Sequence, residues 1–97
     1  MLLDIARNDP GTYARRDAVK ALAAGWPHEP ETVPLLLDRA RHDRGDLGLV
    51  RLAALEALAG LAPTPEAGSV ARELLNYPPL QYRRERIERL IAVVWPE

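Results

Sequence analysis

Two histidines stand beside acidic residues, and such pairs are potential ligands for a metal ion. His28 precedes Glu29, and His42 precedes Asp43. A protein metal site generally needs three or more converging ligands, whereas the sequence predicts a loop for the first pair and a helix end for the second. The chain also contains no cysteine. We therefore expect no metal site and no cofactor, and we expect both histidines to be solvated.

The residue types that catalysis commonly uses are not arranged for it. Ser69 is the only serine, and no Gly-x-Ser-x-Gly motif surrounds it. The segment 45–48 contains two glycines, but it is too short for a phosphate-binding loop and lacks the lysine. Glu85 and Glu88 each have an arginine four residues away on one predicted helix, which favours ion pairs on a solvated face. We therefore predict that the chain is not an enzyme.

A cluster of positive charge at residues 83–86, which read Arg-Arg-Glu-Arg, could contact phosphates. Arg16 and Lys20 could join it on the outward faces of neighbouring helices. The same faces also bear acidic residues, namely Asp17, Glu56, Glu85 and Glu88. The chain has 13 basic and 14 acidic residues, and no aromatic residue is interleaved in the cluster to stack on bases. Nucleic-acid binding is therefore a minor alternative.

The bulk composition indicates one helical domain over residues 1–97. Hydrophobic residues make up 47% of the chain, most of them Ala and Leu, and Phe is absent. Good helix formers therefore outnumber strand formers. No apolar run approaches the ~18 residues that span a bilayer, and the first residues lack the basic flank of a signal peptide. We expect a cytoplasmic protein without a membrane partner.

The sequence repeats itself. Residues 14–23 and 50–59 share Arg, Ala, an aliphatic residue, Ala, Leu and Ala in register, at an offset of 36. Residues 3–9 and 37–43 share Leu, Asp, Ala, Arg and Asp at an offset of 34. A third, weaker copy lies near the C-terminus, and each copy ends on a proline, which stops a helix. The predicted repeats are about 1–27, 28–63 and 64–97.

Each repeat is expected to hold two helices. The six predicted helices run from about 2–8, 10–25, 30–42, 46–61, 65–76 and 80–94, and the first is truncated. Asp46 and Thr64 are candidate N-caps. Short loops between such helices indicate an all-α, right-handed α-solenoid of about three stacked hairpins. Its shared core is predicted to include Val19, Leu22, Leu55, Leu58, Ile87 and Leu90.

The residues of the second copy resemble the HEAT repeat. Segment 50–58 reads Val-Arg-Leu-Ala-Ala-Leu-Glu-Ala-Leu and follows the turn 43–46, which contains two Asp. Segment 9–22 fits the motif nearly as well. The third copy departs from it, because segment 76–79 has no Asp and Arg86 replaces a small residue. The chain is most similar to bacterial HEAT arrays, some of which are fused to NACHT-type signalling ATPases.

The resemblance implies a structural ladder of hydrogen bonds between turn Asp residues and helix Arg residues. Asp9 with Arg15 would form it in the first repeat, and Asp43 or Asp46 would pair with Arg51 in the second. Arg83 has no acid in its own turn, so it would bond to the second repeat or face solvent. HEAT arrays commonly bind proteins on the concave surface, which the second helix of each hairpin forms.

We therefore predict a non-catalytic protein–protein interaction module. Its partner-binding residues would be the outward residues of the second helices, with Leu52 as an exposed apolar contact: Arg16, Asp17, Lys20, Leu52, Glu56, Arg84, Glu85 and Glu88. One alternative is a structural segment of a longer array, which could self-associate through open ends of the solenoid. Trp26 and Trp95 each precede a proline at a helix end, where a ring could anchor a partner or cover the loop end of the hairpin.

Overall fold

The structure, a computed structural model, describes residues 2–96, and this part of the chain contains helices and no strand. Two 3-10 segments, η1 (Asp46–Gly48) and η2 (Pro78–Arg83), precede the fourth and sixth α-helices. The α-helices are α1 (Leu2–Asn8), α2 (Thr12–Gly25), α3 (Thr32–His42), α4 (Leu49–Leu61), α5 (Pro65–Leu74) and α6 (Arg84–Val94). The predicted all-α fold with a short first helix is confirmed.

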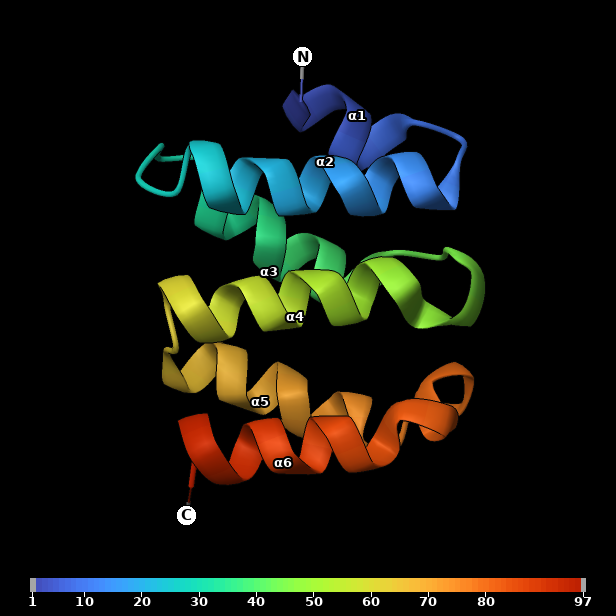
Figure 1. Cartoon of the computed structure of the whole chain (residues 1–97), viewed down its shortest axis with the longest axis vertical. Coiled ribbons are helices and arrows are strands. Elements are labelled where there is room, and N and C mark those ends of the chain that lie inside the picture. Colours follow the sequence, from blue (N-terminus) through green and yellow to red (C-terminus); the bar gives the residue numbers. More distant parts are fainter. Residues whose placement is uncertain (1, 97) are drawn as a thin grey trace.

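The helices form a stack of hairpins (Figure 1). α2, α4 and α6 lie side by side in the layer nearest the viewer, and α3 and α5 lie largely behind them. α1 packs on α2, α3 on α4 and α5 on α6, while α2 also packs directly on α4. The second helices of the hairpins therefore share one face of the molecule. The right-handed sense of the stack and the repeat boundaries near residues 27 and 63 stay predictions.

Prolines and one side-chain cap set several helix ends. α2, α4 and α6 each end within two residues of a proline, as expected for a residue that lacks an N–H. The Thr64 hydroxyl accepts a hydrogen bond from the Ala67 N–H at 3.2 Å and so caps α5. The prediction of Thr64 as an N-cap is confirmed.

The start of α4 differs from the prediction. Asp46 does not cap it, because the N-cap residue is Gly48 and α4 begins at Leu49. Leu47 and Gly48 both have left-handed backbone conformations, with φ of 58° and 67°. A Cβ atom on Gly48 would lie 2.6 Å from Leu80 Cγ. The chain therefore turns sharply here, and glycine is required by both the backbone conformation and the close approach of Leu80.

The sixth α-helix begins four residues later than predicted, at Arg84 instead of Leu80. Pro78 and Pro79 supply no N–H to a helix, and Leu80 N–H closes a turn on the carbonyl of Tyr77 at 2.9 Å. The extra turn is therefore a 3-10 helix, which is longer than the 3-10 segment before α4.

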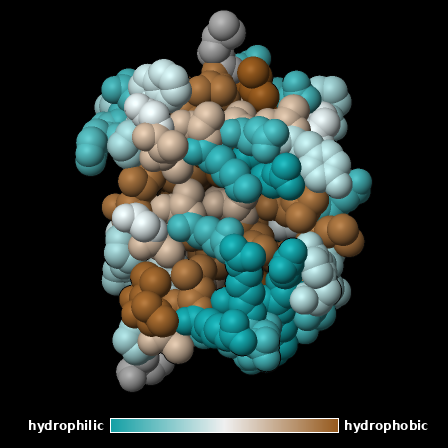
Figure 2. Space-filling model, viewed as in Figure 1, coloured by the Kyte–Doolittle hydropathy of each residue, from teal (hydrophilic) through white to brown (hydrophobic). Residues whose placement is uncertain are grey.

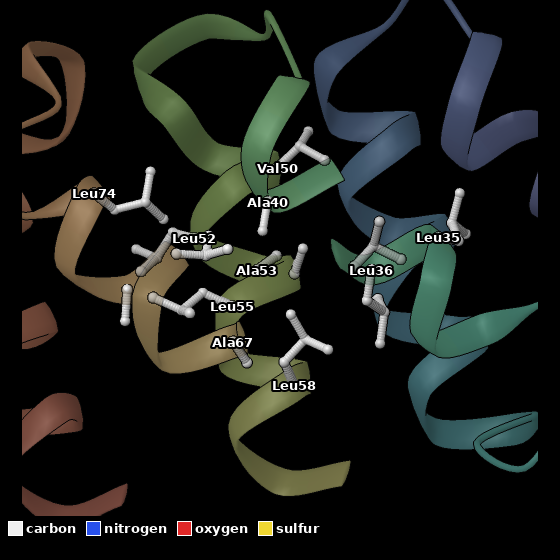
Figure 3. Close-up of a cluster of buried hydrophobic side chains, with 14 of the residues drawn as sticks. Leu35, Leu36, Ala40, Val50, Leu52, Ala53, Leu55, Leu58, Ala67 and Leu74 are labelled. Carbon is white, nitrogen blue, oxygen red and sulfur yellow. The ribbon is translucent and has the colours of Figure 1, made fainter. Parts of the chain in front are cut away.

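The core runs through all three hairpins. Figure 3 shows its central part, where side chains of α3, α4 and α5 meet. Five of the six predicted core residues are buried, and Leu90 is only partly buried. Leu52 is a correction: it is 7% exposed and belongs to this cluster, so it is not the exposed contact predicted from the sequence. It faces inward because α4 is covered by neighbours on both sides, and apolar residues occupy nearly all of its circumference.

The two tryptophans differ in environment. Trp95 is 7% exposed, and its indole N–H donates to the Thr64 carbonyl at 3.0 Å. Its ring lies so close to Gly68 that a Cβ atom there would be 2.9 Å from Trp95 Cδ1. Trp26 is 50% exposed. Trp95 thus closes the end of the third hairpin where α5 begins and α6 ends, opposite the loop at which the sequence placed it, whereas Trp26 leaves half of its surface in solvent.

Candidate functional site

A hollow of about 140 Å³ lies where α2, α4 and the start of the third hairpin's second helix meet. We call it the charged hollow, because four of its eight lining residues are basic and one is acidic. Its lining residues are Arg16, Lys20, Leu49, Leu52, Ala53, Glu56, Arg83 and Arg86. Leu52 thus contributes only a small part of its surface, at the floor.

A second hollow of about 460 Å³ continues along the space between α2 and α4. It shares Lys20, Ala53 and Glu56 with the charged hollow. We call it the apolar hollow, and its lining residues are Lys20, Ala23, Ala24, Ala53, Glu56, Ala57, Gly60 and Leu61. Small side chains on both helices leave this space open. The two hollows together form what we call the α2–α4 groove.

The charges in the groove are partly paired. Arg86 of α6 forms an ion pair with Glu56 of α4. Arg16 contacts the exposed carboxylate of Asp17 at 3.3 Å, and its guanidinium lies 4.9 Å from the centre of the Tyr13 ring. The only acidic side chain that lines the groove is therefore held by one of the four basic ones. Figure 2 shows hydrophilic residues across the middle of this face, beside paler and apolar areas.

Four of the predicted partner-binding residues lie outside the lining of the groove, namely Asp17, Arg84, Glu85 and Glu88. Arg84 donates to the Leu75 carbonyl and forms an ion pair with Glu88 at 3.3 Å. Glu85 forms an ion pair with Arg89 at 3.1 Å. The structure therefore places Arg16, Lys20, Leu52 and Glu56 together, with Asp17 at the rim, and separates the acidic residues of α6 from them.

Two arginines of the basic cluster 83–86 belong to this face, although the sequence placed neither among the partner-binding residues. Arg83 and Arg86 line the charged hollow, although Arg83 was assigned to the ladder, and sequence reasoning missed two tyrosines beside the arginines. Tyr13 and Tyr82 are 63% and 52% exposed, and the Arg83 guanidinium lies 5.4 Å from the centre of the Tyr82 ring. Aromatic rings therefore do lie beside the arginines. For Tyr13 the signal was its three-residue spacing from Arg16, which is about one turn of α2. Tyr82 directly precedes Arg83 and lies before α6, so helical spacing gave no signal for it.

The turn residues and helix arginines do connect the hairpins, but with different partners from those expected. Arg15 donates to the backbone carbonyl of Asp9 at 2.7 Å, not to its carboxylate. The same guanidinium donates two hydrogen bonds to the Asp43 carboxylate in the next hairpin, at 2.9 and 3.2 Å. Asp43 is 1% exposed and also accepts from the Gly45 N–H at 2.7 Å. Arg39 contacts the same carboxylate at 3.4 Å.

Arg51 connects the second hairpin to the third in a similar way, but its partner in the third hairpin is an aromatic ring instead of a carboxylate. Arg51 donates to the backbone carbonyl of Asp43 at 2.7 Å, and its guanidinium lies 4.2 Å from the centre of the Tyr77 ring. Tyr77 follows Asp43 by the same 34 residues that separate Asp43 from Asp9. In the third hairpin Arg84 donates to a backbone carbonyl, whereas Arg83 is exposed. The structure thus places Arg84, not Arg83, at the equivalent position.

Two further observations concern other classes of function. No group of three or more His, Cys, Asp or Glu side chains gathers within residues 2–96 as a metal-binding set would. In the same part of the chain, no helix is long and apolar enough to cross a membrane.

Comparison with known proteins agrees with this architecture. The family model described as HEAT repeats matches residues 1–92. Neither a curated protein nor a solved structure matches the chain. The family match covers the three hairpins, the arginines that connect them and the second helices that form the groove. This chain therefore belongs to the HEAT-repeat family.

Proposed function

We propose that this chain is a non-catalytic protein-binding module whose partner contacts the shared face of α2, α4 and α6. The observation that carries the proposal is the α2–α4 groove, which combines basic side chains at one end with an apolar floor at the other. HEAT repeats generally mediate protein interactions or scaffolding. A surface with both polar and apolar lining is typical of sites that bind another macromolecule.

The rigidity of the groove supports the proposal. α2 packs directly on α4, and the Arg15–Asp43 ion pair joins α2 to the C-terminal end of α3 in the same hairpin as α4. The apolar hollow is lined by residues of two regular helices, and Ala23, Ala53, Ala57 and Leu61 among them are buried or half-buried. Because the surface exists before the partner binds, little ordering entropy opposes association.

The test is a quantitative affinity capture from lysate of the source cell with a photo-crosslinking residue in place of Ala24, which is exposed and lines the apolar hollow. The matched position is Ser69, which is exposed on α5 in the other layer. We expect one protein to be crosslinked at position 24 and not at position 69. The same protein crosslinked only at position 69 would overturn the placement on this face.

A charge variant complements the crosslink. Arg16→Glu/Lys20→Glu changes two residues of the charged hollow, the partly buried Arg16 and the exposed Lys20. Arg7→Glu is the control, because it is exposed on α1 and away from the groove. We expect capture to fall with the double variant and not with the control. Equal capture by all three proteins would refute the surface assignment.

A second candidate function is structural, as a segment of a longer helical array; the sensor part of a signalling ATPase of the NACHT type is one such setting. Val93 on α6 is 80% exposed, and Leu90, Ile91 and Val94 on the same helix are partly buried. This apolar surface is suited to packing against another hairpin. A chain that sediments as a monomer at high concentration, and whose sedimentation does not change with Val93→Glu, would speak against it.

A further inference from the structure

We propose that the partner presents a short linear segment to the α2–α4 groove, with acidic side chains at one end and apolar side chains at the other. This inference rests on the function proposed above and assigns its chemistry. The acidic end would lie in the charged hollow, and the apolar end would lie in the apolar hollow.

The charged hollow is suited to a carboxylate. Arg16, Lys20 and Arg83 reach it from two hairpins. Its one acidic lining residue, Glu56, is already paired with Arg86, and the Asp17 carboxylate that contacts Arg16 at 3.3 Å is 68% exposed and does not line the hollow. Two of the cations are also supported by rings, since Arg16 stacks on Tyr13 and Arg83 on Tyr82. Three positive charges thus converge on a partly enclosed site, where opposite charge is favoured more strongly than on an open surface.

The apolar hollow is suited to one or two apolar side chains. Apart from Lys20 and Glu56, which it shares with the charged hollow, every residue that lines it is Ala, Gly or Leu. Gly60 is one of these lining residues, and a Cβ atom built there meets nothing within 4 Å. Covering such a surface releases water from apolar area and favours binding. The hollow has few polar groups to orient a polar ligand.

The distance between the two ends sets the spacing in the partner. Arg16 and Ala24 are eight residues apart on α2, as are Leu52 and Gly60 on α4. Eight residues of α-helix rise about 12 Å. An extended peptide covers that distance in about four residues. The acidic and apolar groups of an extended ligand should therefore be about four residues apart.

Nucleic acid fits the same face less well. A single strand needs a basic groove that follows its backbone over several nucleotides and aromatic faces that are free to stack. Here the basic side chains converge on one hollow, and the continuation of the groove is apolar. Tyr13 and Tyr82 each already have an arginine over one face. The exposed carboxylates of Glu85 and Glu88 also lie on α6 beyond the hollow.

The test is selection of a random twelve-residue peptide display library on the intact chain. We expect enrichment of peptides with Asp or Glu about four residues from Leu, Ile, Phe or Trp. Enriched peptides are then synthesised, and their affinities are measured by fluorescence anisotropy for the wild type and three variants. A labelled oligothymidine is measured in parallel.

The variants separate the two ends of the groove. Gly60→Leu fills the apolar hollow, and Gly25→Leu is its matched control, because Gly25 ends the neighbouring helix and also has nothing within 4 Å of a built Cβ atom. We expect Gly60→Leu and Arg16→Glu/Lys20→Glu each to weaken binding about tenfold or more, with Gly25→Leu within about twofold. Circular dichroism confirms that each variant is folded.

Three results would overturn the inference: enrichment of peptides without acidic residues, equal effects of Gly60→Leu and Gly25→Leu, or oligothymidine binding that competes with the peptides. The last result would assign the groove to nucleic acid. If no peptide motif is enriched while a protein is still crosslinked through position 24, the linear-segment inference fails and the proposed function stands. Absence of crosslinking as well would refute both.

Discussion

The Arg15 guanidinium in the first hairpin donates two hydrogen bonds to the Asp43 carboxylate in the second, at 2.9 and 3.2 Å. Asp43 is almost fully buried, and the Arg15 side chain is only 12% exposed. This pair spans 28 residues of sequence and joins the two hairpins at one end of α2. It is therefore the strongest polar link between repeats in residues 2–96.

Removal of Asp43 should destabilise the fold strongly. Asp43→Ala leaves the guanidiniums of Arg15 and Arg39 and the N–H of Gly45 without this acceptor. Loss of one partner of a buried ion pair costs about 3 kcal/mol or more. Urea unfolding followed by circular dichroism measures it. Asp17→Ala, at a side chain that is 68% exposed, should change stability by less than about 0.5 kcal/mol, and equal losses in the two variants would contradict this role.

We predict that a cation–π attraction between the Arg51 guanidinium and the Tyr77 ring stabilises the fold. In a double-mutant cycle of Arg51→Met and Tyr77→Leu, we expect a coupling free energy of about 0.5–1 kcal/mol. Tyr77→Phe should retain it, because the ring face and not the hydroxyl lies under the guanidinium. A coupling near zero, or the same loss for Phe as for Leu, would show that the ring merely fills space.

Substitution by Ala should destabilise the fold much more at Trp95 than at Trp26. Trp95→Ala removes a buried ring that contacts Gly68 and the Thr64 carbonyl, and its loss should cost about 3 kcal/mol. Trp26→Ala should cost less than about 1 kcal/mol, because half of that ring is already in solvent. Thermal unfolding of the two variants tests the difference. A larger effect of Trp26→Ala would contradict it and would show that the ring of Trp26 contributes more to stability than that of Trp95.

Two glycines of the same hairpin should respond in opposite directions. Gly60→Ala should raise the free energy of unfolding by about 0.5–1 kcal/mol, because Gly60 is helical and a methyl group there meets nothing. Gly48→Ala should lower it by more than about 1 kcal/mol, because its φ is 67° and the methyl group would contact Leu80. Denaturant midpoints measure both, and a stabilising Gly48→Ala would contradict the left-handed turn.

The repeat, the hairpins and most of the core could be predicted from sequence, because apolar spacing and proline positions depend on local geometry alone. The start of α4 could not. A left-handed Leu47 is intrinsically unfavourable, and tertiary packing of Leu80 against Gly48 accompanies it. Sequence periodicity contains no information about such a contact between hairpins.

The candidate site was predictable only in part, for a related reason. Arg16, Lys20 and Glu56 were placed on the correct face, but Leu52 was placed one face too far outward. Helical spacing gives the direction of a side chain relative to its own helix, whereas burial depends on how many neighbours surround that helix. α4 lies between two hairpins, so positions that would be exposed on a terminal helix are covered there.

The hydrogen bonds from arginine side chains to main-chain carbonyls affect which residues of the turns can change during evolution. Arg15, Arg51 and Arg84 each donate to a main-chain carbonyl, namely that of Asp9, Asp43 and Leu75. Every amino acid has this acceptor, so mutation of the acceptor residue does not remove the contact while the turn keeps its path. Only the donor is restricted to one residue type. Turn sequences can thus diverge between repeats, as Leu75 and Tyr77 already show, while each second helix stays anchored to the turn that precedes it.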